Sequence, residues 1–164
     1  MEKRLFLVCP TDCLEGIINQ KFNSINFFYT SVGNSFCINN KTINNIKELA
    51  IRHGIKNIDF VLSLNNTFIY NTLSQETKPK DEILNRYQQE IKEKKEQVKI
   101  IDQEENNQYL LLSYILNDKI KQLEHQLADC IEKIKIGAKV YNRDINDFEN
   151  IYSELINFQK YNMN

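Results

Sequence analysis

The first 63 residues alternate between short apolar runs and amphipathic segments, and this alternation restricts the fold more than any other feature of the chain. Residues 4–9, 25–30 and 57–63 are rich in aliphatic, aromatic and β-branched side chains, as buried strands are. Residues 12–20 and 42–53 carry apolar side chains at helical spacing. A β-α-β-α-β order places its strands in parallel, joined by right-handed crossovers. The sequence therefore predicts an α/β fold with a mainly parallel sheet flanked by helices.

The second half of the chain is more polar and predicts longer helices. Lys, Glu and Gln dominate residues 80–105, which indicates a solvated helix that forms a polar excursion from the α/β body. A narrow apolar seam broken by Lys94 leaves open a second interpretation, in which this helix binds a protein partner. Residues 108–130 predict another helix, 133–141 a fourth strand and 144–160 a last docked helix. The expected strand order is 2-1-3-4.

Length and charge exclude several classes of protein. A chain of 164 residues is long enough for one domain and short for two, so we expect a single α/β domain over residues 1–164. Its 21 basic and 22 acidic residues give a net charge of -1, which predicts binding neither to nucleic acid nor to anionic membranes. No apolar run reaches the length of a membrane span or a signal-peptide core, so we expect a cytoplasmic protein.

Three loops of the predicted fold should meet at one edge of the sheet. In an open parallel sheet, ligands bind beyond the carboxyl ends of the strands, near the point where the strand order reverses. Residues 9–13, 30–34 and 63–67 follow the first three predicted strands. The sequence thus predicts a cleft at this edge, and the side chains expected to line it are Thr30, Gly33, Asn34, Ser63 and Asn66.

Asp12, Cys9 and Cys13 are the candidate catalytic residues at this cleft. A thiol beside a carboxylate permits thiol-dependent or small-molecule chemistry, and a thiol at the start of a helix is activated by the helix dipole. Structural roles explain the same residues: Asp12 can cap a helix, and Cys9 can be a buried inert thiol. The four cysteines lack zinc-ribbon spacing, and Cys37 lies in a loop near Cys13 at a distance that the sequence leaves open.

Four stretches of the chain, taken in order, resemble the β-class carbonic anhydrases. Leu7-Val8-Cys9-Pro10-Thr11-Asp12-Cys13 lies where that family has a strand ending in Cys-x-Asp-x-Arg, and residues 25–34, ending Val-Gly-Asn, resemble its strand and Ala-Gly-Asn loop. Residues 46–61 are similar to the helix, glycine turn and strand that precede the family's Gly-His-Ser-Gly-Cys, and residues 134–142 to its last strand. The resemblance covers most of the chain and implies the family's fold.

The same resemblance implies where a metal site would lie. Enzymes of the family hold zinc with Cys, His and Cys beside an Asp-Arg pair, and zinc-bound hydroxide attacks carbon dioxide. In this chain the positions of the family's His and second Cys hold Ser63 and Asn66, which are not zinc ligands. Aligning Asp12 with the family's Asp places Pro10 at the first ligand position and Leu14 at the position of the Arg. The residues that remain from the family's site are Asp12, Gly33 and Asn34.

The sequence accordingly predicts a non-catalytic carbonic-anhydrase-like protein, with no zinc or other cofactor, that serves in binding or assembly. The resemblance implies a homo-oligomer, in its simplest form a dimer. Two alternatives remain at this stage: a thiol-dependent or small-molecule enzyme that uses the cleft, and a helical module that binds a protein through residues 80–105. Both histidines have structural interpretations, because His53 falls at the end of a predicted helix and His125 in a polar helix turn.

Overall fold

A five-stranded sheet forms the centre of the molecule in the computed structural model, which describes residues 1–36, 40–74, 79–101, 108–128 and 134–152. The strand order is β2-β1-β3-β4-β5, and the first four strands are parallel. This confirms the predicted α/β class and the order 2-1-3-4, to which β5 adds an antiparallel edge strand. The strands are β1 (Lys3–Val8), β2 (Ile25–Thr30), β3 (Asn57–Ser63), β4 (Lys135–Asn142) and β5 (Asp147–Asn150).

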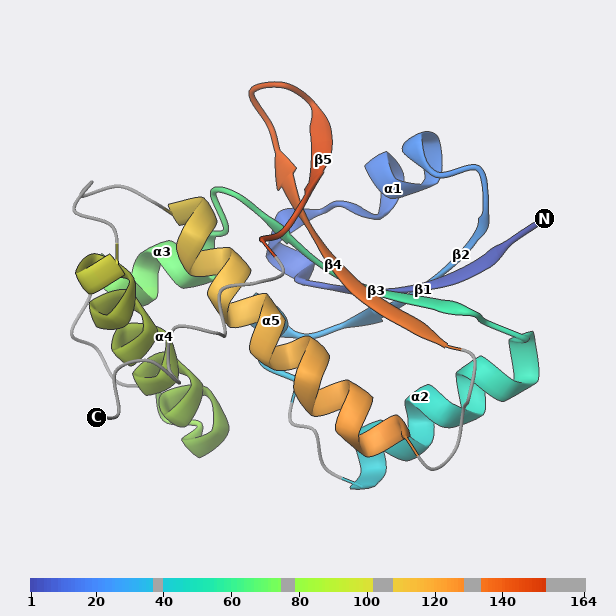
Figure 1. Ribbon diagram of the computed structural model, residues 1–164, viewed down its shortest axis with the longest axis horizontal. Coiled ribbons are helices and arrows are strands. Elements are labelled where there is room, and N and C mark those ends of the chain that lie inside the picture. Colours follow the sequence, from blue (N-terminus) through green and yellow to red (C-terminus); the bar gives the residue numbers. More distant parts are fainter. Residues whose placement is uncertain (37–39, 75–78, 102–107, 129–133, 153–164) are drawn as a thin grey trace.

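Helices cover both faces of the sheet (Figure 1). The α-helices are α1 (Glu15–Lys21), α2 (Asn40–His53), α3 (Thr67–Ser74), α4 (Glu82–Ile101) and α5 (Gln108–Leu127). Two 3-10 turns, Pro10–Asp12 after β1 and Val32–Asn34 after β2, lie at the carboxyl ends of the strands. Helix α1 packs on one face with Phe6, Val8 and Val61, whereas α2 and α5 pack on the other with Leu5, Leu7 and Phe60. Helix α3 contacts both 3-10 turns and α4. None of the helices in the described ranges combines the length and apolar character that crossing a membrane requires.

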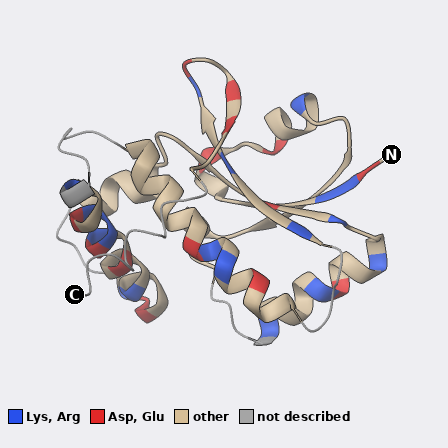
Figure 2. Cartoon of the chain, viewed as in Figure 1, with Lys and Arg blue, Asp and Glu red and all other residues tan. Residues whose placement is uncertain are grey.

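The apolar seam of the polar helix is used within the chain itself. Tyr87, Ile91 and Val98 are buried in the core between α3, α4 and α5. Lys94, which interrupts the seam, pairs with Asp118 of α5 and lies over the ring of Tyr114. Only the outer face of α4 is charged and exposed, with both signs interspersed along it (Figure 2). Among the seam residues whose side chains the structure describes, Tyr87, Ile91 and Val98 are therefore not free to bind a partner helix.

The prediction of a last helix over residues 144–160 is wrong for the part that the structure describes. Residues 143–146 form a turn and Asp147–Asn150 form β5, while residues 153–160 lie outside the described ranges. Asn146 adopts a φ of 50° and its side-chain oxygen accepts a hydrogen bond of 2.7 Å from the Tyr141 hydroxyl. Phe148, one of the apolar residues that suggested a helix, is partly buried by packing on Tyr141 and Phe22.

Candidate functional site

The carboxylate of Asp12 joins the ends of β1 and β3. One oxygen accepts the Ser63 backbone N–H at 2.7 Å, and the other accepts the Asn66 side-chain amide at 3.0 Å. Asp12 is only 2% exposed, so both hydrogen bonds form away from water. The prediction that Asp12 caps the helix after β1 is wrong, because α1 begins three residues later, at Glu15, and the carboxylate points to β3 instead.

Asn66 carries this contact into α3. Its side-chain oxygen accepts the Ile69 backbone N–H at 3.0 Å, which is the hydrogen bond of a helix N-cap, while its amide group donates to Asp12. The Asn66 side chain thus donates to Asp12 with its NH₂ group and accepts from α3 with its oxygen. Because Asp12 can only accept, it orients the oxygen of Asn66 toward the helix. The sequence interpretation missed α3, and with it this role of Asn66.

Burial raises the pKa of the Asp12 carboxyl, while the hydrogen bonds from Ser63 and Asn66 and the charge of Arg143 act to lower it. Arg143, from the turn between β4 and β5, donates to the backbone carbonyl of Asp12 at 2.6 Å. An arginine therefore lies beside Asp12 although Leu14 stands where the family has one. No sequence signal placed Arg143 here, because the contact spans 131 positions of the chain.

The two candidate thiols have different environments. Cys9 is fully buried, and its sulfur accepts the Gly33 backbone N–H at 3.0 Å and lies 3.0 Å from the Thr11 hydroxyl oxygen. Cys13 is exposed, with a φ of 53°, and its thiol donates to the Pro10 carbonyl at 3.6 Å. Cys13 precedes the N-cap of α1 rather than lying inside the helix. Cys37 is outside the described residues.

Two stacked aromatic rings fill the space above Gly33. Its φ of 58° is in the left-handed region, and an added Cβ would lie 2.3 Å from the Phe68 ring. The Tyr87 hydroxyl donates to the Gly33 carbonyl at 2.7 Å, and the rings of Tyr87 and Phe68 lie 6.0 Å apart with planes at 7°. Residues of α3 and α4 therefore cover the loop after β2, and side chains fill the predicted cleft at this point.

The remaining predicted cleft residues lie around the same point. Asn34 and Ser63 are fully buried, and the Asn34 amide donates to the Val61 carbonyl at 2.9 Å. Within the described part of the chain, the Asn34 side-chain oxygen and the Ser63 hydroxyl have no hydrogen-bond partner. Thr30 is exposed at the end of β2. The structure thus gathers Cys9, Asp12, Gly33, Asn34, Ser63 and Asn66, and leaves Cys13 and Thr30 at the surface.

This set of donors does not fit zinc. Cys9 belongs to the core cluster on the α2 and α5 face of the sheet, whereas Ser63 is paired in register with Tyr141, which packs on the α1 face. Hydroxyl and amide groups are poor zinc ligands. No group of three His, Cys, Asp or Glu side chains able to hold a metal ion occurs among the residues that the structure describes.

Neither histidine joins the site. His53 ends α2, as predicted, and its ring lies 4.4 Å from the ring of Phe27. His125 is exposed in the last turn of α5, also as predicted. Both histidines therefore have the structural surroundings that their sequence positions indicated.

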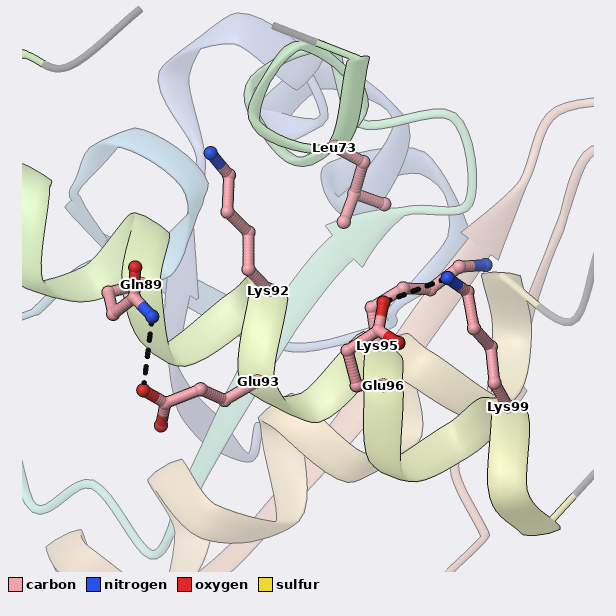
Figure 3. A pocket seen from close by; sticks show the side chains of 7 residues that line it. All are labelled: Leu73, Gln89, Lys92, Glu93, Lys95, Glu96 and Lys99. Carbon is pink, nitrogen blue, oxygen red and sulfur yellow. Dashed lines mark hydrogen bonds and ion pairs between the residues drawn. The ribbon is translucent and has the colours of Figure 1, made fainter. Parts of the chain in front are cut away.

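A groove of about 390 Å³ lies between α3 and α4, away from Asp12 (Figure 3). Lys99 pairs with Glu96 at 2.8 Å, and Gln89 donates to Glu93 at 3.2 Å, so its rim is held by contacts within α4. Lys92 and Lys95 add two further positive charges. The groove is lined by Leu73, Gln89, Lys92, Glu93, Lys95, Glu96 and Lys99.

Comparison with solved structures gives a consistent result. A β-carbonic anhydrase from the filamentous ascomycete Sordaria macrospora superposes with a TM-score of 0.71 at 14% identity, covering 91% of this chain and 80% of that one. The chain has the β-carbonic anhydrase fold. The wild-type β-carbonic anhydrase CafD of Aspergillus fumigatus gives a TM-score of 0.72 at 11% identity, covering 93% of this chain and 90% of that one. The Coccomyxa β-carbonic anhydrase in complex with acetazolamide gives 0.68 at 12% identity, covering 91% and 71%.

At these identities the similarity concerns the fold alone. The sequence matches no protein-family model, and it matches none of the curated proteins. The β-carbonic-anhydrase-like architecture is thus carried by the arrangement of strands and helices.

Proposed function

We propose that this protein is a non-catalytic member of the β-carbonic anhydrase fold, which serves in binding or assembly and needs no zinc. One observation carries the proposal. Asn66, which the resemblance places at the position of a zinc-binding Cys, uses its side-chain amide to bond Asp12 and its side-chain oxygen to cap α3, while Ser63, at the position of the His, contributes only its backbone N–H to Asp12. The stacked rings of Phe68 and Tyr87 support it, because they occupy the space above Gly33 at the same edge of the sheet.

Zinc analysis of the purified protein, combined with a carbon dioxide hydration assay, tests this proposal. We expect substoichiometric zinc after equilibration with micromolar zinc and a hydration rate equal to that of the buffer. Stoichiometric zinc together with turnover would refute the proposal. The Ser63→Ala variant is a matched control. If a metal were held near this position, the zinc content of the variant would differ from that of the wild type.

For assembly, we propose a homo-oligomer built from the edge of the sheet formed by β2. The Sordaria macrospora relatives in fold are described as tetrameric. In this chain β2 is an edge strand without a charged residue, and edge strands that must stay unpaired usually carry charges or prolines. Ile25, at the start of β2, is 43% exposed.

Light scattering of the Ile25→Lys variant tests this edge. We expect an oligomer for the wild type and a smaller molar mass for the variant, because a lysine on an edge strand opposes its pairing with another edge. Ile145→Lys is the control, since Ile145 is 58% exposed in the turn before β5. A monomeric wild type, or an equal mass loss in both variants, would contradict assembly through β2.

The two alternative functions receive less support. A thiol enzyme needs an accessible sulfur beside Asp12, yet Cys9 is fully buried and Cys13 is turned to the surface. A protein-binding module on residues 80–105 would have to use the charged outer face of α4, because Tyr87, Ile91 and Val98 are buried within the chain.

A further inference from the structure

A second cavity, of about 650 Å³, opens between the β4–β5 hairpin and the start of α5. Leu64, which follows β3, and Asn142, which ends β4, contribute to its lining. The cavity therefore lies at the carboxyl edge of the sheet, where α/β proteins bind their ligands, but outside the buried network around Asp12. None of its lining residues takes part in the Asp12 contacts.

Two tyrosines form a corner of this cavity. The ring centroids of Tyr109 and Tyr152 lie 5.1 Å apart with planes at 78°, an edge-to-face arrangement. The Tyr109 hydroxyl donates to the Asn150 carbonyl. Two side chains of α5 hold the backbone of Tyr152. The Ser113 hydroxyl accepts its N–H at 3.3 Å, and the Asn117 amide donates to its carbonyl. The corner is thus fixed before any ligand binds.

Glu149 gives the corner a negative charge. Its carboxylate is half-buried and accepts a hydrogen bond of 3.4 Å from the Asn142 amide. Burial raises the pKa of the Tyr109 hydroxyl, and the nearby charges of Glu149 and Tyr152 raise it further, so the carboxylate acts on the same corner. Glu149 is the one charged side chain among the described residues that line the cavity.

One lysine of the hairpin is held at the edge of the cavity by Asn150, which contributes to the lining. Lys139 donates to the Asn150 side chain at 2.6 Å. Along paired strands, successive side chains alternate between faces. Lys139 and Asn150 therefore share a face with Tyr141 and Phe148, which pack toward α1, while Glu149 points to the opposite face with Asn142.

We propose that this corner is a binding site for an organic cation, namely a protonated or methylated amine. The rings of Tyr109 and Tyr152 line the cavity and attract the cation through their quadrupoles, and the Glu149 carboxylate pairs with its charge. A neutral sugar would gain stacking from the rings but nothing from the charge. This inference goes beyond the proposed function and is independent of whether the Asp12 region holds a metal.

Choline and its uncharged carbon isostere, 3,3-dimethyl-1-butanol, test the proposal on the full-length protein. In an NMR titration we expect choline to shift the backbone amide signals of Tyr109, Glu149 and Asn150, and to bind at least tenfold more tightly than the alcohol. The Glu149→Gln variant preserves the shape of the side chain and its hydrogen bond from Asn142, and we expect it to lose most of this preference.

Asp147→Asn is the matched control. Asp147 is an exposed carboxylate on the same strand and does not line the cavity. Its replacement by Asn changes net charge equally and keeps the side-chain oxygen that accepts the Phe148 N–H, so choline binding should remain within twofold of the wild type. Equal binding of choline and the alcohol would overturn the proposal. Retention of full choline affinity in Glu149→Gln, tighter binding of glucose than of choline, or the absence of any shift at these three amides would do the same.

Discussion

The pairing between Asp12 and Asn66 can be tested by exchanging the two side chains. In the wild type the Asp12 carboxylate accepts both the Ser63 N–H and the Asn66 amide, and the Asn66 oxygen caps α3 at the Ile69 N–H. All acceptors face donors in this arrangement. The exchange Asp12→Asn with Asn66→Asp preserves the volume of both side chains and reverses the direction of one hydrogen bond.

Each single substitution should be costly. In Asp12→Asn the new amide oxygen can accept the Ser63 N–H, but its NH₂ group then meets the NH₂ group of Asn66. Rotating Asn66 relieves this conflict only by turning its NH₂ group toward the Ile69 N–H. One buried donor is left unpaired in either case, which costs about 1–3 kcal/mol. Asn66→Asp alone places two carboxylates against each other in a buried site, and we expect a loss of at least the same size.

The double variant should recover most of this loss. The amide at position 12 accepts the Ser63 N–H and donates to the carboxylate at position 66, whose other oxygen caps α3. Asp is as good an N-cap as Asn and interacts favourably with the helix dipole. We therefore expect the free energy of unfolding of the double variant to lie within about 1 kcal/mol of the wild type. If the two substitutions acted independently, the double variant would instead be destabilised by the sum of the two single losses.

Urea unfolding of the four proteins measures this coupling, provided that the m-value stays constant. Asp81→Asn is the control, because Asp81 caps α4 at the Leu84 N–H from an exposed position and should change stability by only about 0.5 kcal/mol. Losses that add in the double variant would refute the account of Asp12 as the residue that orients the cap of α3.

Three further outcomes are expected from single side chains. Gly33→Ala should lose about 1–3 kcal/mol more stability than Gly54→Ala, since both have positive φ but only Gly33 has an aromatic ring where the Cβ would go; equal losses by urea unfolding would contradict the close contact. Burial raises the pKa of Asp59, so its charged form is disfavoured by folding, and the free energy of unfolding of the wild type should rise relative to Asp59→Asn as pH falls from 7 toward 4. A parallel pH profile for both proteins would show that this carboxyl is not perturbed. Alkylation followed by peptide mass spectrometry should modify Cys13 within the native protein and Cys9 only on unfolding, and rapid native modification of Cys9 would revive the thiol-enzyme alternative.

The sequence predicted the first three strands to within one residue at either end, because their apolar runs are local signals with clear ends. Gly54, with a φ of 64°, ends α2 as expected. The pattern of α3 could not be recognised in the same way. Thr67–Ser74 is rich in aromatic and β-branched residues, which favour strands, and it is a helix because Asn66 caps it and Ile69 is buried against the sheet.

For the candidate site, sequence placed the residues at the correct edge of the sheet but could not give their contacts. Asp12 was predicted to cap the helix that follows it. Its carboxylate oxygens instead accept hydrogen bonds from Ser63 and Asn66, more than 50 positions away. The contact of Tyr87 with Gly33 spans 54 positions and that of Arg143 with Asp12 spans 131. Such contacts depend on tertiary packing, and no local pattern encodes them.

The buried network also explains how this fold holds together at the carboxyl edge of its sheet. Three elements meet there: the turn after β1, the end of β3 and the start of α3. Asp12 links all three through two hydrogen bonds, and one amide, that of Asn66, transmits the link to the helix. The Asp12 carboxylate has a hydrogen-bond donor at each oxygen without a metal ion, which is consistent with the proposed absence of zinc. If zinc instead occupied this edge in the native protein, the exchange of Asp12 and Asn66 would move a carboxylate within its reach, and zinc content would differ between the wild type and the double variant. Equal and negligible zinc in two proteins of equal stability is the result expected of a network that is structural.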